Sequence, residues 1–206
     1  MLKMEDYPYL SECIKFHGHL CPGLSLGYKA SIIAMEEMKV KKLEDEIVAI
    51  VENDSCFVDS VQVITGCTLG KGNLIIKDHG KMVLNVLSRK TKKGLRVALR
   101  YGSPFFLLLD DVLPLADKVF SGCATCEEKE RFFTLQKERA YKVLKASIDE
   151  LFSVRVVEFE IPPFARIVRS EPCSVCNEPV MVLKMETKDG KRVCKVCALA
   201  LEERNL

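Results

Sequence analysis

The sequence lacks a long apolar run and any strong excess of charge of one sign. Its apolar stretches are short, as in Phe105–Leu109, whereas a helix needs about 20 apolar residues to span a bilayer. Its 31 Lys and Arg residues nearly balance 29 Asp and Glu residues, so no net field favours nucleic acid or an anionic membrane. We therefore expect no membrane association, and the charge gives no support for a nucleic-acid partner.

A secretory signal is also missing from the N-terminal stretch MLKMEDYPYL, which carries acidic residues and no apolar core. The expected location is therefore the cytoplasm. Because the cytosol is reducing, the ten cysteines are not expected to form a disulfide framework. Metal binding or thiol chemistry is the expected use of these residues.

The hydrophobic fraction of 48% suits one ordinary core with a small appendage. Apolar periodicity and turn residues predict helices at 22–38, 56–64 and 126–151, and strands at 47–51, 74–78, 81–88, 95–102 and 154–162. The three strands between 74 and 102 are expected to be antiparallel neighbours. This order predicts an α+β fold, a mostly antiparallel sheet packed by helices. We place the core domain at 1–165 and a zinc finger at 166–206.

The C-terminal region carries four cysteines in two C-x2-C pairs: Cys173, Cys176, Cys194 and Cys197. This spacing is typical of a four-cysteine zinc site. The segment between the pairs is expected to form a hairpin with Asp189-Gly190 at its turn, and the second pair to open a helix, as in a treble clef. So short a region cannot build a stable core, so one structural zinc ion would supply its folding energy. Incidental buried cysteines and an iron–sulfur cluster are the alternatives.

A second concentration of metal-binding residue types lies in FHGHLCPGLSLGYKAS, residues 16–31, which contains His17, His19 and Cys21. In an extended segment both rings would point to the same side. Cys21 would precede a helix N-terminus, where the helix dipole favours the thiolate. Such residues can bind a zinc-like ion or pair a base with a nucleophile. A buried structural histidine is the plainer interpretation.

The predicted helix at 56–64 adds Cys56, Asp59 and Gln62 on roughly one face, with Cys67 after its end. We expect five residues to contribute to a second metal site: His17, His19, Cys21, Cys56 and Cys67. If the site is catalytic, the expected participants are His19, Cys21, Cys56, Asp59 and Gln62. The alternative is that Cys56 and Cys67 are small core residues and that Asp59 caps a helix or is solvated.

A glycine-rich stretch and a third pair of cysteines leave more than one interpretation. GCTLGKGN lacks the G-x4-G-K-[ST] pattern of a phosphate loop, so a tight structural turn is expected, with anion binding near Lys71 as the alternative. Cys123 and Cys126 form a third C-x2-C pair without the βαβ context of a thioredoxin-like site. A disulfide, half of a metal site and two spare thiols all stay open.

Three stretches together resemble the FmdE family, named for a component of formylmethanofuran dehydrogenase: residues 16–31, CFVDSVQVITGCTLGKGNL at 56–74 and DHGK at 78–81. The resemblance covers roughly the first 160 residues. It implies an α+β core, commonly a homodimer, with a groove lined by the histidine- and cysteine-bearing segments, and some members add a treble-clef zinc finger. It does not imply oxidation of formylmethanofuran, because the sequence supplies neither a pterin site nor an iron–sulfur array.

These observations predict a zinc-binding accessory or interaction protein of this family, with a His/Cys-lined groove in the core domain. Its finger would contact a protein partner, and the small-molecule ligand is not identified by the sequence. The alternative is a metal- or thiol-dependent enzyme acting on a small molecule at that groove.

Overall fold

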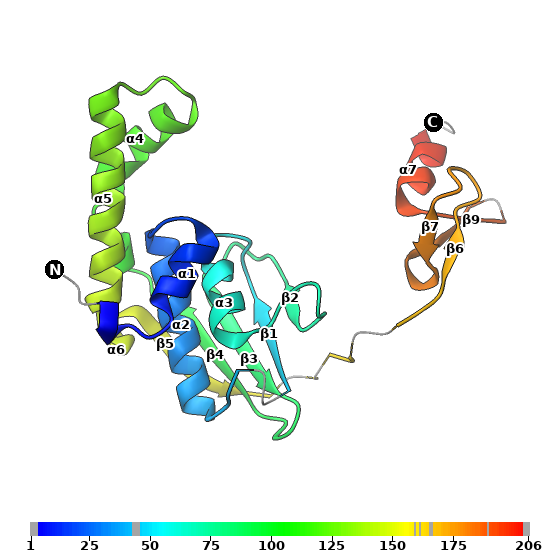
Figure 1. Ribbon diagram of the computed structural model, residues 1–206, viewed down its shortest axis with the longest axis horizontal. Coiled ribbons are helices and arrows are strands. Elements are labelled where there is room, and N and C mark those ends of the chain that lie inside the picture. The colour runs from blue at the N-terminus through cyan, green and yellow to red at the C-terminus, as the bar shows by residue number, and fades with distance from the viewer. Residues whose placement is uncertain are drawn as a thin grey trace. The chain divides into compact units, whose positions relative to one another are not determined.

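The computed structural model describes residues 4–42, 46–158, 160, 162–164, 167–188 and 190–203. The chain divides into two compact units, Met1–Phe164 and Ala165–Leu206, and Figure 1 shows the elements of each. The division lies next to the boundary expected between residues 165 and 166. Within the described ranges, no helix combines the length and the apolar character that a membrane crossing needs.

The core unit is built on a five-stranded sheet of order β2-β1-β3-β4-β5. Its strands are β1 Ile47–Val51, β2 Leu74–Ile76, β3 Val83–Ser88, β4 Gly94–Leu99 and β5 Phe152–Val157. The ladders β1–β3, β3–β4 and β4–β5 are antiparallel, whereas β2 is parallel to β1. The predicted α+β class with a mostly antiparallel sheet is therefore confirmed.

One part of the strand prediction is wrong, because β2 is not an antiparallel neighbour of β3. After β2 the chain crosses the end of β1 instead of turning back in a hairpin. His79 N and Lys81 N both donate to the carbonyl oxygen of Glu52, at 3.0 and 2.9 Å. These bonds carry the chain past β1, so that β3 pairs on the opposite edge of β1 from β2.

Three helices of the N-terminal part lie side by side on one face of the sheet (Figure 1). They are α1 Leu10–His17, α2 Pro22–Met38 and α3 Phe57–Thr65, preceded by a short 3-10 helix, η1, at Met4–Asp6. Side chains of α2 and α3 form the main core with the covered face of the sheet, among them Leu26, Ala30, Phe57, Val61, Ala49, Val51, Leu84 and Val86. This packing fixes the positions of the helix ends over the sheet.

Two glycines allow α2 to pack very closely against α3. A Cβ atom on Gly27 would lie 2.1 Å from the carbonyl oxygen of Phe57, and one on Gly23 would lie 3.2 Å from the Cβ of Cys56. Ser60 Oγ donates to the carbonyl oxygen of Leu24 at 2.7 Å across the same contact. The N-terminal ends of the two helices are thereby brought together.

A helical arm completes the core unit and rises beyond the sheet in Figure 1. It consists of η2 Pro104–Phe106, α4 Leu109–Phe120 and α5 Cys126–Lys145, followed by the short α6 Ile148–Leu151. The helix predicted at 126–151 is thus broken after Lys145, because Ala146 is extended and Ser147 caps α6. At the break Lys29 Nζ donates to the carbonyl oxygens of Leu144, at 3.1 Å, and of Ala146.

The C-terminal unit contains two small hairpins and a helix. β6 Ser170–Pro172 pairs with β7 Pro179–Met181, and β8 Glu186–Lys188 pairs with β9 Lys191–Val193. The 3-10 helix η3 Val182–Lys184 lies between the hairpins, and α7 Lys195–Glu203 follows them. The expected hairpin and helix are present, while Asp189 of the expected turn lies outside the described residues.

Candidate metal centres

Three chain segments bring metal-binding atoms together in the core unit. His17 is the last residue of α1, Cys21 is the N-cap of α2, and Cys56 is the N-cap of α3. The ring nitrogen and the two sulfur atoms all lie within 4.8 Å of one another. His17 Nε2 is 3.7 Å from Cys21 Sγ. One imidazole and two thiols form a donor set suited to zinc or another soft divalent ion.

The local sequence explains how His17 and Cys21 meet. Leu10 and Cys13 are both buried and fix α1 against its neighbours. Gly18 then takes a left-handed conformation, φ 98° and ψ −21°, which ends α1. The extended Cys21 starts α2, and its Sγ accepts the N–H of Leu24 at 3.4 Å. The expectation of an extended segment across His17 and His19 is therefore wrong, because His17 belongs to a helix.

Asp59 fixes the orientation of the His17 ring. Its Oδ2 lies 2.7 Å from His17 Nδ1. The side chain of Asp59 is 33% exposed and that of His17 is 13% exposed. The Asp59 carboxylate accepts a hydrogen bond from Nδ1–H, so the lone pair of Nε2 faces the cysteines. Metal-binding histidines usually donate their second ring N–H to a carboxylate or carbonyl in this way.

The two thiols form a coupled pair at two helix N-termini, where positive dipole ends favour thiolate. A hydrogen bond from the Cys21 thiol is the main cause that lowers the pKa of Cys56 to about 6, and the nearby His17 also lowers it. The same hydrogen bond, followed by burial, raises the pKa of Cys21. The two opposite shifts favour a thiolate at Cys56 beside a thiol at Cys21, and a bound metal ion would displace the remaining proton.

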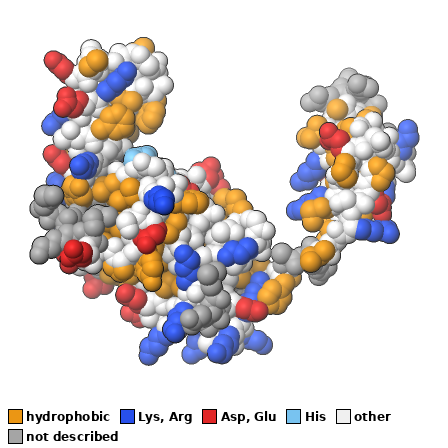
Figure 2. All heavy atoms as spheres, in the orientation of Figure 1, with side chains coloured by type: hydrophobic (Ala, Val, Ile, Leu, Met, Phe, Trp, Pro, Cys, Tyr) orange, Lys and Arg blue, Asp and Glu red, His pale blue; other side chains and the backbone are white. Residues whose placement is uncertain are grey.

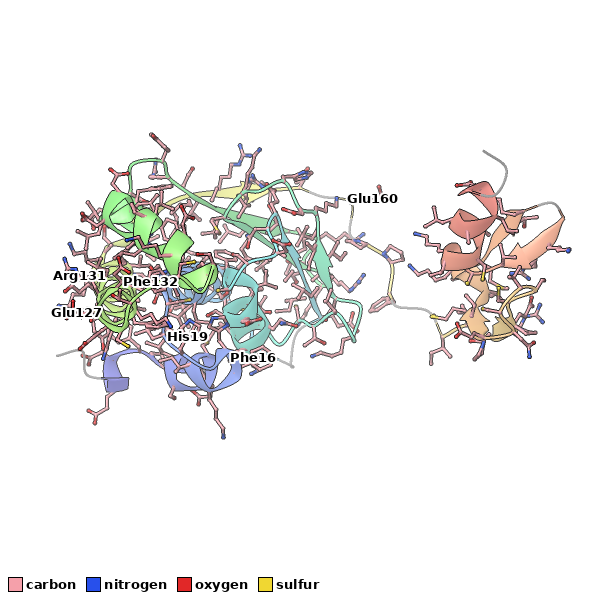
Figure 3. The ribbon with its side chains drawn as sticks, turned by 90° about the horizontal axis from the view of Figure 1, so that it is seen from above. Phe16, His19, Glu127, Arg131, Phe132 and Glu160 are labelled. Carbon is pink, nitrogen blue, oxygen red and sulfur yellow. The ribbon has the colours of Figure 1, made fainter. Side chains whose placement is uncertain are left out.

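The other residues expected at this site lie differently. The ring of His19 lies against that of His17 with centroids 4.6 Å apart and the planes tilted by 34°. His19 is exposed, and Figure 3 labels it together with Phe16. Gln62 is half-buried farther along α3. Cys67 is fully buried, and its Sγ donates to the carbonyl oxygen of Ile47 at 3.5 Å. The structure does not bring Cys67 to the group, because the length of α3, about 13 Å for nine residues, separates it from Cys56.

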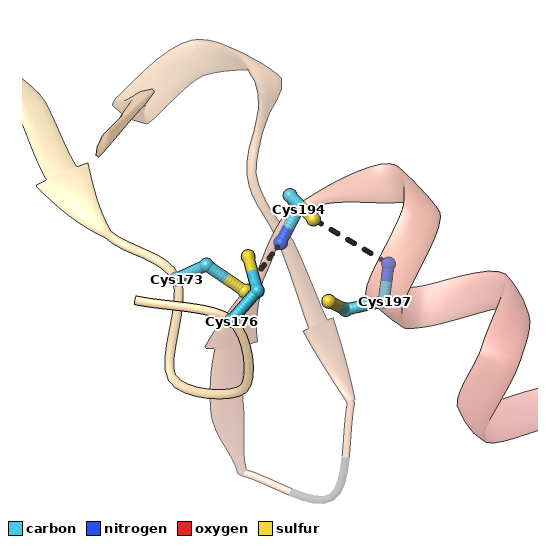
Figure 4. A group of neighbouring side chains, drawn as sticks. All are labelled: Cys173, Cys176, Cys194 and Cys197. Atoms are coloured by element: carbon cyan, nitrogen blue, oxygen red, sulfur yellow. Dashed lines mark hydrogen bonds between the residues drawn. The ribbon is translucent and has the colours of Figure 1, made fainter. Parts of the chain in front are cut away.

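The four cysteines of the C-terminal unit converge as a second group (Figure 4). Their sulfur atoms all lie within 4.8 Å of one another, and thiolates around a tetrahedral zinc ion are about 3.8 Å apart. Cys173 Sγ accepts the backbone N–H of Cys194 at 3.3 Å, and Cys194 Sγ accepts that of Cys197 at 3.4 Å. Backbone N–H groups of Cys176 and Cys194 lower the pKa of Cys173 to about 6. These residues can therefore bind a metal ion, and their donors are compatible with zinc.

The family model described as "FmdE, Molybdenum formylmethanofuran dehydrogenase operon" matches residues 16–153. The chain belongs to the FmdE family. The resemblance drawn from the three sequence stretches is thereby confirmed, and the chain is a metal-binding FmdE-like protein by its family and its two donor clusters. The matched range includes every residue of the core group.

Two individual proteins are also similar to the chain. A probable S-adenosyl-L-methionine-binding protein of Archaeoglobus fulgidus is 36% identical over 190 residues, which are 89% of this chain and 50% of that protein. The chain thus spans about half the length of this relative. A tungsten formylmethanofuran dehydrogenase FmdE-like protein of Syntrophus aciditrophicus superposes with a TM-score of 0.61 at 22% identity, over 92% of this chain and 90% of that chain. It shares the fold.

Sequence reasoning missed three features of this FmdE core. It did not identify α1, although the buried positions Leu10 and Cys13 follow the i, i+3 spacing of a helix. It gave Asp59 no bond to His17, since nothing local indicates a pair 42 residues apart. It also overlooked Gly23 and Gly27, whose spacing of four residues puts both on one face of α2.

Proposed function

We propose that this FmdE-family protein is a metal-binding accessory protein that holds two metal ions per chain. A structural zinc ion would be bound by the four cysteines of the C-terminal unit, and a second ion by His17, Cys21 and Cys56. The observation that carries the proposal is the convergence of three donor atoms from α1, α2 and α3 within 4.8 Å. The bond from Asp59 to the far nitrogen of His17 supports it.

The two sites differ in the number of protein ligands. Four thiolates fill all the coordination positions of a tetrahedral zinc ion, so its role is structural, which suits a treble-clef finger of this size. In the core unit three protein ligands are the number that catalytic zinc sites use. Nε2 of His17 would be the ligand atom, because Nδ1 is engaged by Asp59. We therefore assign the function of the protein to the core site and its stability to the finger.

The second candidate function is a metal- or thiol-dependent enzyme acting on a small molecule at the core site. The three-ligand count favours it, as does the lowered pKa of Cys56. In this proposal the metal ion would supply a Lewis acid. His19 and Gln62 would bind and orient the small molecule, while Asp59 would hold the His17 ring in place. The relative from Archaeoglobus fulgidus names one molecule to test, S-adenosyl-L-methionine, by isothermal titration calorimetry of the metal-loaded chain.

We also propose that the protein acts as a cytoplasmic homodimer and that its finger contacts a protein partner. Exposed hydrophobic side chains on the arm support an interaction there, since Phe120 is 80% and Phe133 is 59% exposed. Hydrophobic side chains are visible on the arm in Figure 2, where charges of both signs are interspersed over the core unit. Light scattering coupled to size-exclusion chromatography measures the dimer directly.

Metal content per chain tests the main proposal. We expect two ions in the wild type. The single variants His17→Ala and Cys56→Ser should each keep only the ion of the C-terminal unit. The double variant Cys176→Ser/Cys197→Ser should keep only the ion of the core unit. The matched control is Cys123→Ser/Cys126→Ser, which removes two exposed cysteines and should leave two ions. Circular dichroism shows whether each variant keeps its fold. A folded wild type that holds one ion, unchanged in Cys56→Ser, would contradict a metal site in the core.

The cobalt form of the same protein distinguishes the two candidate functions. If the core site accepts an external ligand, its visible absorption bands should shift when imidazole is added, and those of the His17→Ala variant should not. Bands that do not respond to imidazole would exclude a small molecule as a direct ligand of the core metal and would leave the accessory role.

A further inference from the structure

A cavity of about 620 Å³ lies at the C-terminal end of α2. The core metal site lies at the N-terminal end of the same helix, and a helix of 17 residues is about 25 Å long. The cavity is therefore separate from the metal site. Its volume is within the range of small-molecule pockets, about 300–1,000 Å³.

The floor of this cavity is apolar and its rim is basic. Ile32, Met35, Val40 and Ile64 contribute the hydrophobic lining. Lys39, Lys41 and Lys42 stand around it, and Glu36 is the one acidic residue among the lining residues that the structure describes. Ile64 is buried, and Lys39 and Lys42 are exposed. The arrangement offers a hydrophobic surface to the body of a ligand and a net positive charge to its polar end.

Two residues at the rim have left-handed backbone conformations that non-glycine residues rarely adopt. Tyr9 has φ 66° and Lys39 has φ 52°. Such conformations are strained for residues other than glycine and gather at functional sites. In Tyr9 the conformation is held from both sides, since Leu10 N donates to Tyr7 O at 3.2 Å and Cys13 N donates to Tyr9 O at 3.1 Å.

The consequence of this backbone is an aromatic side chain at the mouth of the cavity. Tyr9 lines the cavity and is 58% exposed, although the next residue, Leu10, is only 1% exposed. Burial of Leu10 therefore pins the segment, and the left-handed turn leaves Tyr9 outside the core. An exposed tyrosine ring beside an apolar floor is suited to stacking against a flat apolar ligand.

We propose that this cavity binds a small organic anion with an aromatic body. The apolar floor and Tyr9 contact the aromatic body, and Lys39 and Lys42 attract the anionic group. A neighbouring cavity of about 230 Å³ shares Pro8, Ile32 and Glu36 with it, which leaves room for a ligand that extends along α2. This site does not depend on the metal ions proposed above.

The probe for the test is 8-anilinonaphthalene-1-sulfonate, an aromatic anion whose fluorescence rises in apolar sites. With the metal-loaded full chain we expect saturable binding of one molecule. The Lys39→Glu/Lys42→Glu variant should bind about tenfold more weakly, because two surface charges are reversed. The control Lys90→Glu reverses an exposed lysine of the β3–β4 turn and should bind as the wild type does.

An uncharged analogue, N-phenyl-1-naphthylamine, separates the two halves of the proposal. Its affinity should change less than twofold in the lysine variant, since it uses the apolar floor alone. Equal sulfonate affinities in wild type and Lys39→Glu/Lys42→Glu, or an equal loss in Lys90→Glu, would overturn the proposal. So would a fluorescence rise that does not saturate. The variants change exposed residues only, so circular dichroism is expected to stay unchanged.

Discussion

Asp59 Oδ2 lies 2.7 Å from His17 Nδ1 and joins the first turn of α3 to the last residue of α1. The bond leaves Nε2 of the same ring 3.7 Å from Cys21 Sγ. One carboxylate thus decides which nitrogen of His17 is free for a metal ion.

Replacing Asp59 by asparagine should weaken metal binding at the core site by about 10- to 100-fold. The amide keeps the size of the side chain but loses the charge that makes His17 a stronger ligand. Competition with a chromophoric zinc chelator measures the affinity of each site. The finger should bind as before, and Asp54→Asn, a change of an exposed acid in the loop before α3, is the control. An unchanged core affinity would show that Asp59 has only a structural role.

Close packing of α2 against α3 leads to a prediction about stability. Gly27→Ala should lower the free energy of unfolding by about 2 kcal/mol or more, because its new Cβ would lie 2.1 Å from the carbonyl oxygen of Phe57. Gly70→Ala is the control, since nothing lies within 4 Å of a Cβ there. Urea denaturation measures both. If the two variants unfold at the same urea concentration, the close approach of α2 and α3 does not exist in solution.

The same substitution should also affect the core metal site. Cys21 and Cys56 are the N-caps of the two helices that Gly23 and Gly27 hold together. Separating the helices would move the sulfur atoms apart, so a folded Gly27→Ala protein should lose affinity for the second metal ion. Metal content of the purified variant measures this loss, and the Gly70→Ala protein should keep both ions.

Local patterns were enough to predict much of the fold. The helix expected at 22–38 matches α2, and the strand expected at 47–51 matches β1, because each has a clear apolar pattern and defined ends. The pairing of β2 could not be predicted this way. It depends on where the carbonyl of Glu52 meets His79 and Lys81, a contact between segments that no local periodicity reports.

The candidate site shows the same limit. Residue types and helix starts predicted that Cys21 and Cys56 would lie at N-termini, and both do. The choice between His17 and His19 as a ligand depends on a left-handed Gly18 and on a carboxylate 42 residues away. The nearness of Cys67 to α3 in sequence predicts that it joins the group, yet it packs beside Ile47 in the core.

Removal of zinc should unfold the C-terminal unit while the core unit keeps its structure. The unit has a small buried cluster of Cys173, Val193 and Ala198, so most of its folding free energy would come from the metal ion. A strong chelator should make residues 167–203 sensitive to trypsin and leave 4–158 resistant. Cys176→Ser/Cys197→Ser should be sensitive without chelator. A finger that resists trypsin in the presence of chelator would contradict a metal-dependent fold.

A polar network on the sheet gives the last prediction. Glu52, only 9% exposed, accepts hydrogen bonds from both terminal nitrogens of Arg96, with Nη2 at 3.1 Å from Oε2. Asn85 Nδ2 lies 3.4 Å from Glu52 Oε1. The hydrogen bonds from Arg96, more than that from Asn85, hold the pKa of Glu52 below its ordinary value of 4.5.

A carboxyl group whose pKa is lower in the folded than in the unfolded state stabilises the protein above the unfolded value. This stabilisation is lost as the pH falls through the folded value.

We therefore expect Glu52→Gln to lower the free energy of unfolding at pH 7 by about 3 kcal/mol, the cost of leaving a buried charge unpaired. It should also flatten the loss of stability below about pH 4.5. Urea denaturation across this pH range measures both effects. The control is Glu46→Gln, an exposed acid just before β1, which should keep the wild-type profile. The double variant Glu52→Gln/Arg96→Met carries neither charge. It should regain most of the stability at pH 7, because the cost in Glu52→Gln arises from the unpaired guanidinium. A double variant that is no more stable than Glu52→Gln alone would contradict this account.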